Sequence, residues 1–315
     1  MRTGTEALSL LTAPLNVEVL TALGEEPTPL HDLRQAVGHP PVTTMRSYLR
    51  RLTETGVLER YREDDFPGSV SYSLAKPGKK LLAVAGVLCD WLQMAPVGTL
   101  ELGGRGSKSA VKALLDGWDA GIVRALAARP LALTELDRLI PQISYPALER
   151  RLTAMRQVGL IEPDPNRNGR VARCQVTEWL RRGVAPLTAA VGWEAVYLQD
   201  RTPAPSPLDA EAILLLAVPL SNLPSDASGT CRFAVQFRRG TELSFAGVMV
   251  DVADGEIRSC VTRLEGQPDA WATASVLDWF RWLRLGDDQG VETGGDVRLA
   301  RALEGALRDA LAPVG

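Results

Sequence analysis

The chain has 315 residues, of which 45% are hydrophobic, and this length suits two or three globular domains better than one core. Its longest apolar run, residues 212–220, includes Pro219 and is far shorter than the roughly 20 residues that cross a bilayer. The N-terminus lacks the charged segment, apolar stretch and cleavage site of an export signal. We therefore expect a cytoplasmic protein without a membrane span.

The net charge of −3 is divided unevenly along the chain. Residues 1–200 carry 24 Lys and Arg against 22 Asp and Glu, whereas residues 201–315 carry 11 against 16. The first part is therefore close to neutral. Binding of nucleic acid would have to depend on local basic patches and not on bulk charge.

Residue types that commonly carry metal, redox or catalytic chemistry are scarce. The four cysteines stand singly, and the only histidines are His31 and His39. We expect no disulfide, no zinc site and no cofactor, although a metal site built from carboxylates stays open. The sequence has no nucleophile motif and no phosphate loop, so we do not expect an enzyme.

One segment of the sequence occurs twice. Residues 14–59 and 117–162 align without gaps at a shift of 103, with eight identical pairs. Further pairs are both apolar, such as Leu52 with Met155. Because the apolar positions recur at helical spacing, the two segments are predicted to build the same core. A shift of 102 then places Trp91 opposite Trp193.

Each copy predicts a helix-turn-helix followed by a β-hairpin wing. Gly56 supplies the left-handed residue that commonly follows a helix, and Asn168-Gly169 supplies a hairpin turn in the second copy. In the first copy, the predicted helices cover residues 15–23, 29–37, 43–55 and 77–92, and the predicted strands cover residues 57–62 and 70–74. The second copy repeats this order and ends with a helix over residues 179–197.

The segment LTELDRLIPQISYPALERRLTAMRQVGLIE, residues 133–162, carries a family pattern at Glu135, Leu136, Ile143, Ser144, Arg151, Leu152, Gly159 and Glu162. These positions resemble the HxlR-type winged-helix transcriptional regulators. The first copy resembles the same family after its third helix, in GVLERYREDDFPGSVSYSLAKPGKKLL, residues 56–82. It departs from the family at Pro41, which replaces the serine, and at Tyr48, which replaces the arginine.

The resemblance implies dimers that pair through their first and last helices. Because this chain carries two copies, we expect a pseudo-dimer within one chain, with Trp91 and Trp193 related by a pseudo-twofold axis. The winged-helix domains are predicted in residues 1–95 and 107–200, joined by a glycine-rich segment. Whether chains pair further is left open.

In a winged helix, the N-terminal half of the third helix faces base edges in the major groove of double-stranded DNA. This geometry predicts DNA contacts by Thr43, Thr44, Arg46, Ser47 and Arg50 in the first copy, and by Ser144, Tyr145, Ala147, Glu149, Arg150 and Thr153 in the second. Arg167, Arg170 and Arg173 make the second wing basic, whereas Glu63, Asp64 and Asp65 make the first acidic. The two copies are therefore expected to recognise different sequences, which predicts a non-palindromic operator. These arginines equally suit an ordinary solvated helix face.

After the proline-rich residues 201–207, the pattern changes to strands followed by helices. Asp254-Gly255 predicts a hairpin turn, and Ser275 with Asp278 predicts a capping box. Residues 230–239 alternate, with Phe233 and Val235 on one face. The predicted strands cover residues 230–239, 243–252, 256–264 and 270–274, and the predicted helices cover residues 209–220, 275–285 and 296–311.

Three segments of this region, VADGEI (252–257), DAWATASVLDWF (269–280) and ETGGDVRLARAL (292–303), resemble the sterol-carrier-protein-like fold. The resemblance covers a predicted domain of residues 208–315 and implies an apolar tunnel for an acyl or sterol-like ligand. Its lining is predicted to include Phe233, Phe245, Met249, Trp271, Trp279, Phe280 and Trp282. The alternative is that these side chains simply fill the core.

Together, the sequence predicts an α+β protein with two tandem winged helix-turn-helix domains and a C-terminal sterol-carrier-like domain. The predicted function is a DNA-binding transcriptional regulator, controlled by an apolar ligand or a partner at the C-terminal domain. The alternative is a lipid- or acyl-binding or protein-interaction module whose winged helices serve only for assembly. The operator, the ligand and the direction of regulation are not specified by the sequence.

Overall fold

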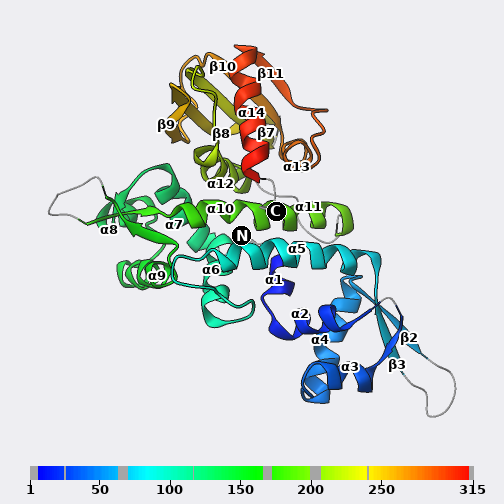
Figure 1. Ribbon diagram of the computed structural model, residues 1–315. Helices are drawn as coiled ribbons and strands as arrows, with labels where there is room; N and C mark the ends of the chain where they lie inside the picture. Colours follow the sequence, from blue (N-terminus) through cyan, green and yellow to red (C-terminus); the bar gives the residue numbers. More distant parts are fainter. Residues whose placement is uncertain are drawn as a thin grey trace.

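The structure is a computed structural model that describes residues 6–24, 26–62, 70–115, 117–165, 172–198, 207–239 and 241–311. Two of its parts are mainly helical with a three-stranded sheet each, and the C-terminal part contains a five-stranded sheet. The long helices α5 (Lys76–Gln93) and α11 (Val184–Tyr197) lie side by side between the first two parts (Figure 1). The C-terminal part packs on the other side of α11 and of α10 (Glu178–Arg182).

The first part confirms the predicted elements to within one residue at each end. It also contains α1, which was not predicted and which buries Leu8, Leu10 and Leu11. Gly56 has a φ of 72°, as expected for the residue that ends the third helix. The elements are α1 (Glu6–Leu11), α2 (Pro14–Ala22), β1 (Thr28–Pro29), α3 (Leu30–Ala36), α4 (Val42–Glu54), β2 (Leu58–Arg62) and β3 (Val70–Leu74), with the sheet order β1-β3-β2.

The second part has the same succession of helices and strands. Leu148, Leu152 and Met155 are buried on α9, at the positions that Met45, Leu49 and Leu52 occupy on α4. The turn at Asn168-Gly169 lies outside the described residues. The elements are α6 (Arg105–Leu115), α7 (Gly117–Ala128), β4 (Leu131–Ala132), α8 (Leu133–Leu139), α9 (Tyr145–Gln157), β5 (Ile161–Pro163) and β6 (Arg173–Val176), with the sheet order β4-β6-β5.

The prediction of one helix over residues 179–197 was wrong, because the chain forms α10 and α11 with a break at Gly183. Pro186 has no backbone N–H, and in a continuous helix its ring would clash with the carbonyl of Arg182. Gly183 also lies against Trp91, since a Cβ added there would be 3.0 Å from the indole ring. The break therefore makes room for a side chain from the first repeat.

Trp91 and Trp179 form a reciprocal pair between α5 and α10. Their rings stack with centroids 4.8 Å apart and an angle of 12° between the planes. Trp91 Nε1 donates to the Trp179 carbonyl at 2.8 Å, and Trp179 Nε1 donates to the Trp91 carbonyl at 2.7 Å. Both side chains are buried, so the pair satisfies two indole donors and two carbonyls away from water.

A second tryptophan bond corresponds to the first through the sequence repeat. Trp193 Nε1 donates to the Pro77 carbonyl at 2.9 Å. The shift of 102 residues that relates Trp91 to Trp193 also relates Pro77 to Trp179. In each case, a tryptophan in one repeat bonds the start of a helix in the other repeat. Trp91 thus contacts α10 and Trp193 contacts α5, whereas the pseudo-twofold relation of the two copies stays a prediction.

The C-terminal part is a mixed sheet covered by helices on one face. Its strand order is β11-β10-β7-β8-β9, with β10 parallel to β7, and α12, α13 and α14 contact the face that holds Phe233 and Val235. The predicted elements are present, whereas β11 was not predicted. The elements are α12 (Pro207–Ala217), the 3-10 helix η1 (Val218–Leu220), β7 (Gly229–Arg239), β8 (Glu242–Ala253), β9 (Glu256–Val261), β10 (Ala270–Ser275), α13 (Val276–Leu285), β11 (Glu292–Gly295) and α14 (Val297–Leu311).

Two local predictions for this part are confirmed. Asp254 and Gly255 have φ values of 53° and 76°, as a tight hairpin turn requires. The N-cap half of the predicted capping box is present, because the Ser275 side chain accepts a hydrogen bond from the Asp278 backbone N–H at 3.2 Å. The Asp278 carboxylate accepts a hydrogen bond from the Ser275 hydroxyl at 2.6 Å.

We expect Trp91→Phe to lower the free energy of unfolding by about 1–2 kcal/mol, because the buried Trp179 carbonyl loses its donor. Urea unfolding of the full chain measures this change. Trp271→Phe is the matched control, since that side chain is 36% exposed and the same substitution there should change stability by less than about 0.5 kcal/mol. Equal losses in the two variants would contradict a special role for the reciprocal pair.

Candidate nucleic-acid interface and interdomain cleft

The five predicted DNA-contacting residues of the first copy share the solvent face of α4. Thr43, Thr44, Arg46, Ser47 and Arg50 are all exposed, opposite the buried face of Met45, Leu49 and Leu52. Arg50 lies 3.9 Å from Glu54, but both side chains are mostly exposed, so this ion pair is weak. The structure therefore brings these residues together on one accessible surface.

Not every arginine of α4 belongs to this surface. Arg51 Nη2 lies 2.7 Å from Glu6 Oε1 and 3.2 Å from Ser9 Oγ. It therefore connects α4 to α1 and has a structural role.

The predicted residues of the second copy lie at the start of α9. Ser144, Tyr145 and Arg150 are exposed, whereas Ala147 is partly buried against the core. Ala147 is thus the least accessible member of the set. Arg167 and Arg170 lie outside the described residues, as do Glu63, Asp64 and Asp65 of the first wing.

Corresponding positions of α4 and α9 carry different side chains on the same exposed face. Arg46 in the first helix corresponds to Glu149 in the second, and Ser47 corresponds to Arg150. Val42, which the sequence interpretation missed, corresponds to Tyr145, and both are exposed apolar residues in the first turn of their helices. The alignment of the repeats would have indicated Val42.

Seven side chains were predicted to line the apolar tunnel, and the structure describes the positions of six of them. These six lie on two faces of the C-terminal sheet. Phe233, Trp279 and Trp282 pack edge to face in the core, with ring centroids 5.7 and 5.4 Å apart, and Trp279 Nε1 donates to the Ala234 carbonyl at 2.8 Å. Phe245 and Trp271 are exposed, and Met249 is partly buried. Met249 and Trp271 lie on the same face of the sheet, on either side of Arg232, because β7 separates their strands.

These six side chains are therefore not brought together around one cavity, and three of them fill the core as the alternative predicted. The side chain of Phe280 lies outside the described residues. Hydrophobicity alone could not assign each residue to a face of the sheet.

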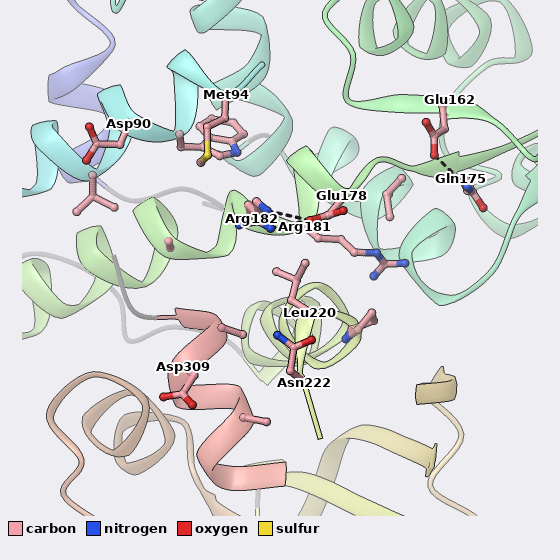
Figure 2. Close-up of a pocket in the computed structure, with 17 residues that line it drawn as sticks. Asp90, Met94, Glu162, Gln175, Glu178, Arg181, Arg182, Leu220, Asn222 and Asp309 are labelled. Atoms are coloured by element: carbon pink, nitrogen blue, oxygen red, sulfur yellow. Dashed lines mark hydrogen bonds and ion pairs between the residues drawn. The ribbon is translucent and has the colours of Figure 1, made fainter. Parts of the chain in front are cut away.

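A cleft of about 670 Å³ lies where all three parts meet. Figure 2 shows Asp90 and Met94 on α5, Arg181 and Arg182 on α10, and Asp309 on α14 around it. The cleft was not predicted from the sequence, because these elements are far apart in the chain and meet only after folding.

Polar contacts fix the C-terminal part against the second repeat beside this cleft. Arg124 Nε on α7 donates to Glu211 Oε1 on α12 at 2.7 Å. Arg181 donates to the carbonyls of Leu215 at 2.8 Å and Ala127 at 3.2 Å. Burial raises the pKa of Glu211, and the charge of Arg124 partly opposes that rise. Burial lowers the pKa of Arg181.

Comparison with known families bears on the first part of the chain. Residues 10–96 match the HxlR-like helix-turn-helix family. These residues form an HxlR-like helix-turn-helix. The match contains α4 and its exposed face, whereas the HxlR resemblance of residues 133–162 is not part of the matched region.

One solved structure that the chain resembles is "Putative transcriptional regulator ytfH from Salmonella typhimurium", at 28% sequence identity. The similarity covers 28% of this chain and 80% of that chain, with a TM-score of 0.26. No curated protein sequence matches the chain. Among the described helices, none is long and apolar enough to cross a membrane.

We expect Arg124→Ala to lower the free energy of unfolding at pH 7 by about 1–3 kcal/mol, because Glu211 stays buried without its partner. Arg124 normally lowers the pKa of Glu211, so its removal should raise that pKa further. The destabilisation should therefore be small below the usual pKa of a glutamate and should grow as pH rises through the raised pKa.

Urea unfolding at several pH values measures this effect. Arg258→Ala is the control, because Arg258 pairs with Glu256 on the exposed surface. A loss in Arg124→Ala that does not change with pH would show that Glu211 is not the cause.

Proposed function

We propose that the chain is a DNA-binding transcriptional regulator that presents two different recognition helices, α4 and α9, from one molecule. The match of residues 10–96 to the HxlR-like helix-turn-helix family carries the proposal. The exposed Thr, Ser and Arg side chains on α4 support it, because these groups can bond base edges and phosphates.

The proposal treats residues 107–200 as a second winged helix and the two repeats as a pseudo-dimer. Its support is the common order of elements and of sheet strands, together with the buried positions that α4 and α9 share. The two tryptophan bonds that correspond through the repeat also support it. One chain would then bind an operator with two half-sites.

Residues 208–315 are proposed to be a regulatory domain. The Arg124–Glu211 pair and the bonds of Arg181 support this role, because they hold the domain against the second repeat. The strand-to-helix order expected from the sterol-carrier-like resemblance is present. Since three of the tunnel residues fill the core, the proposal does not place an apolar ligand inside this domain.

We expect the double variant Arg46→Ala and Arg50→Ala to bind the gene's own upstream DNA at least about tenfold more weakly, because two cations on α4 are lost. The dependence of affinity on salt should also become shallower, with a slope lower by up to about 2. Titration of a labelled duplex over a salt series, with a scrambled duplex alongside, measures both quantities.

The matched control is the double variant Arg258→Ala and Arg263→Ala, which removes the same charge from exposed sites in the C-terminal part. Unchanged affinity in the α4 variant, or wild-type affinity that is equal for the two duplexes, would refute sequence-specific binding by α4.

Arg46 on α4 and Glu149 on α9 occupy corresponding positions but carry opposite charges, and this difference gives a test of half-site specificity. Arginine binds guanine in the major groove, whereas glutamate accepts a hydrogen bond from the cytosine amino group. We therefore expect Glu149→Arg to change the preferred base at one position of one half-site from cytosine to guanine, with discrimination of about 1–3 kcal/mol. Selection from a randomised duplex library measures the change.

Thr153→Ala, further along the same helix, is expected to leave that position unchanged. Identical preferences for wild type and Glu149→Arg would contradict base contact by α9.

A further inference from the structure

We propose that the interdomain cleft is a binding site for a lipophilic organic cation. The volume of about 670 Å³ falls within the range of small-molecule sites, about 300–1,000 Å³, and such sites occur preferentially between domains. Each of the three parts contributes a wall, since α5, α10 and α14 all line the cleft (Figure 2).

The arginines of the cleft already have partners. Arg182 donates to Glu178 Oε1 through Nη2 at 2.7 Å and through Nε at 3.1 Å. Arg181 donates to the carbonyl of Leu215 on α12 and to the carbonyl of Ala127 on α7. Neither Leu215 nor Ala127 lines the cleft. The guanidinium of Arg181 is therefore engaged by backbone carbonyls, and that of Arg182 is balanced in charge by Glu178, although this exposed pair is weak.

The carboxylates of the cleft outnumber these arginines. Asp90 on α5 and Asp309 on α14 lie on opposite walls (Figure 2). Within the part of the chain that the structure describes, neither has a hydrogen bond or an ion pair. Glu162 accepts a hydrogen bond from Gln175 and adds further negative charge. Four carboxylates, those of Asp90, Glu162, Glu178 and Asp309, against two guanidiniums leave the lining with a net negative charge, which attracts cations.

The remaining lining is mixed. Met94 is 40% exposed at the rim, Val87, Leu220, Ala306 and Ala310 are among the apolar residues, and Gln175 and Asn222 add polar groups. Methionine is flexible and polarisable, so it adapts to ligands of different shape. The net negative charge and the apolar side chains together favour an organic cation, whose charge and apolar groups both find partners in the lining. A metal ion is disfavoured, because no cluster of ligands that could hold one is found among the described residues.

A ligand in this cleft would contact both repeats and the C-terminal domain at once. It would stabilise the arrangement of the three parts in which the walls fit the ligand best. The position of α4 relative to α9 would change only if the ligand-free protein has a different arrangement. This regulatory consequence rests on the proposed function, whereas the binding site itself does not.

Calorimetric titration of the full chain with tetraphenylphosphonium tests the site. Tetraphenylborate, an anion of nearly the same shape, is the probe control. We expect the cation to bind with one-to-one stoichiometry and the anion to bind at least tenfold more weakly. The double variant Asp90→Asn and Asp309→Asn should lower cation affinity at least tenfold, and the pair Asp226→Asn and Asp251→Asn, at exposed sites elsewhere, should not.

Absence of cation binding, equal binding of the anion, or full affinity in the Asp90 and Asp309 variant would overturn the proposed site. This titration contains no DNA, so its result does not depend on whether the chain is a regulator. A second titration measures affinity for upstream DNA with and without saturating tetraphenylphosphonium. Unchanged DNA affinity would overturn the coupling, and absence of DNA binding would count against the proposed function alone.

Discussion

The arrangement of the molecule depends on the exchange of indole hydrogen bonds between Trp91 and Trp179. Each ring covers the other and each N–H donates to the other residue's carbonyl. Such a pair needs both backbone segments at fixed positions, because a shift of either one breaks two buried bonds at once. It therefore fixes the end of α5 against the start of α10.

The repeats are similar in topology but differ in their surroundings. The C-terminal part is held to α7 and α10 by Arg124 and Arg181, whose partners Glu211 and Leu215 both lie on α12. The first repeat contributes α5 to the cleft. The C-terminal part thus contacts the two helical parts unequally, and the cleft lies where all three parts meet.

Local patterns predicted the helices, strands, turns and caps well. Residues such as Gly56, Asp254 and Ser275 determine the backbone conformation or hydrogen bonding of the few residues next to them. The exposed face of α4 was predictable for the same reason. The break at Gly183 was not predicted, although Pro186 was a local signal for it.

The partners of the tryptophans and the cleft depend on segments that are far apart in the sequence. The sequence identified Trp91 and Trp193 through the repeat but gave no indication that Trp179 would stack on Trp91. Likewise, the faces of Phe245 and Trp271 depend on strand pairing, which hydrophobicity does not determine.

The packing of α5 against α11 joins residues of one continuous chain. A contact between separate subunits weakens on dilution, because its population depends on protein concentration. The contact between these helices has no such dependence, since its partners are held at a high effective concentration by the intervening residues. Even at a few molecules per cell, α5 would therefore stay packed against α11.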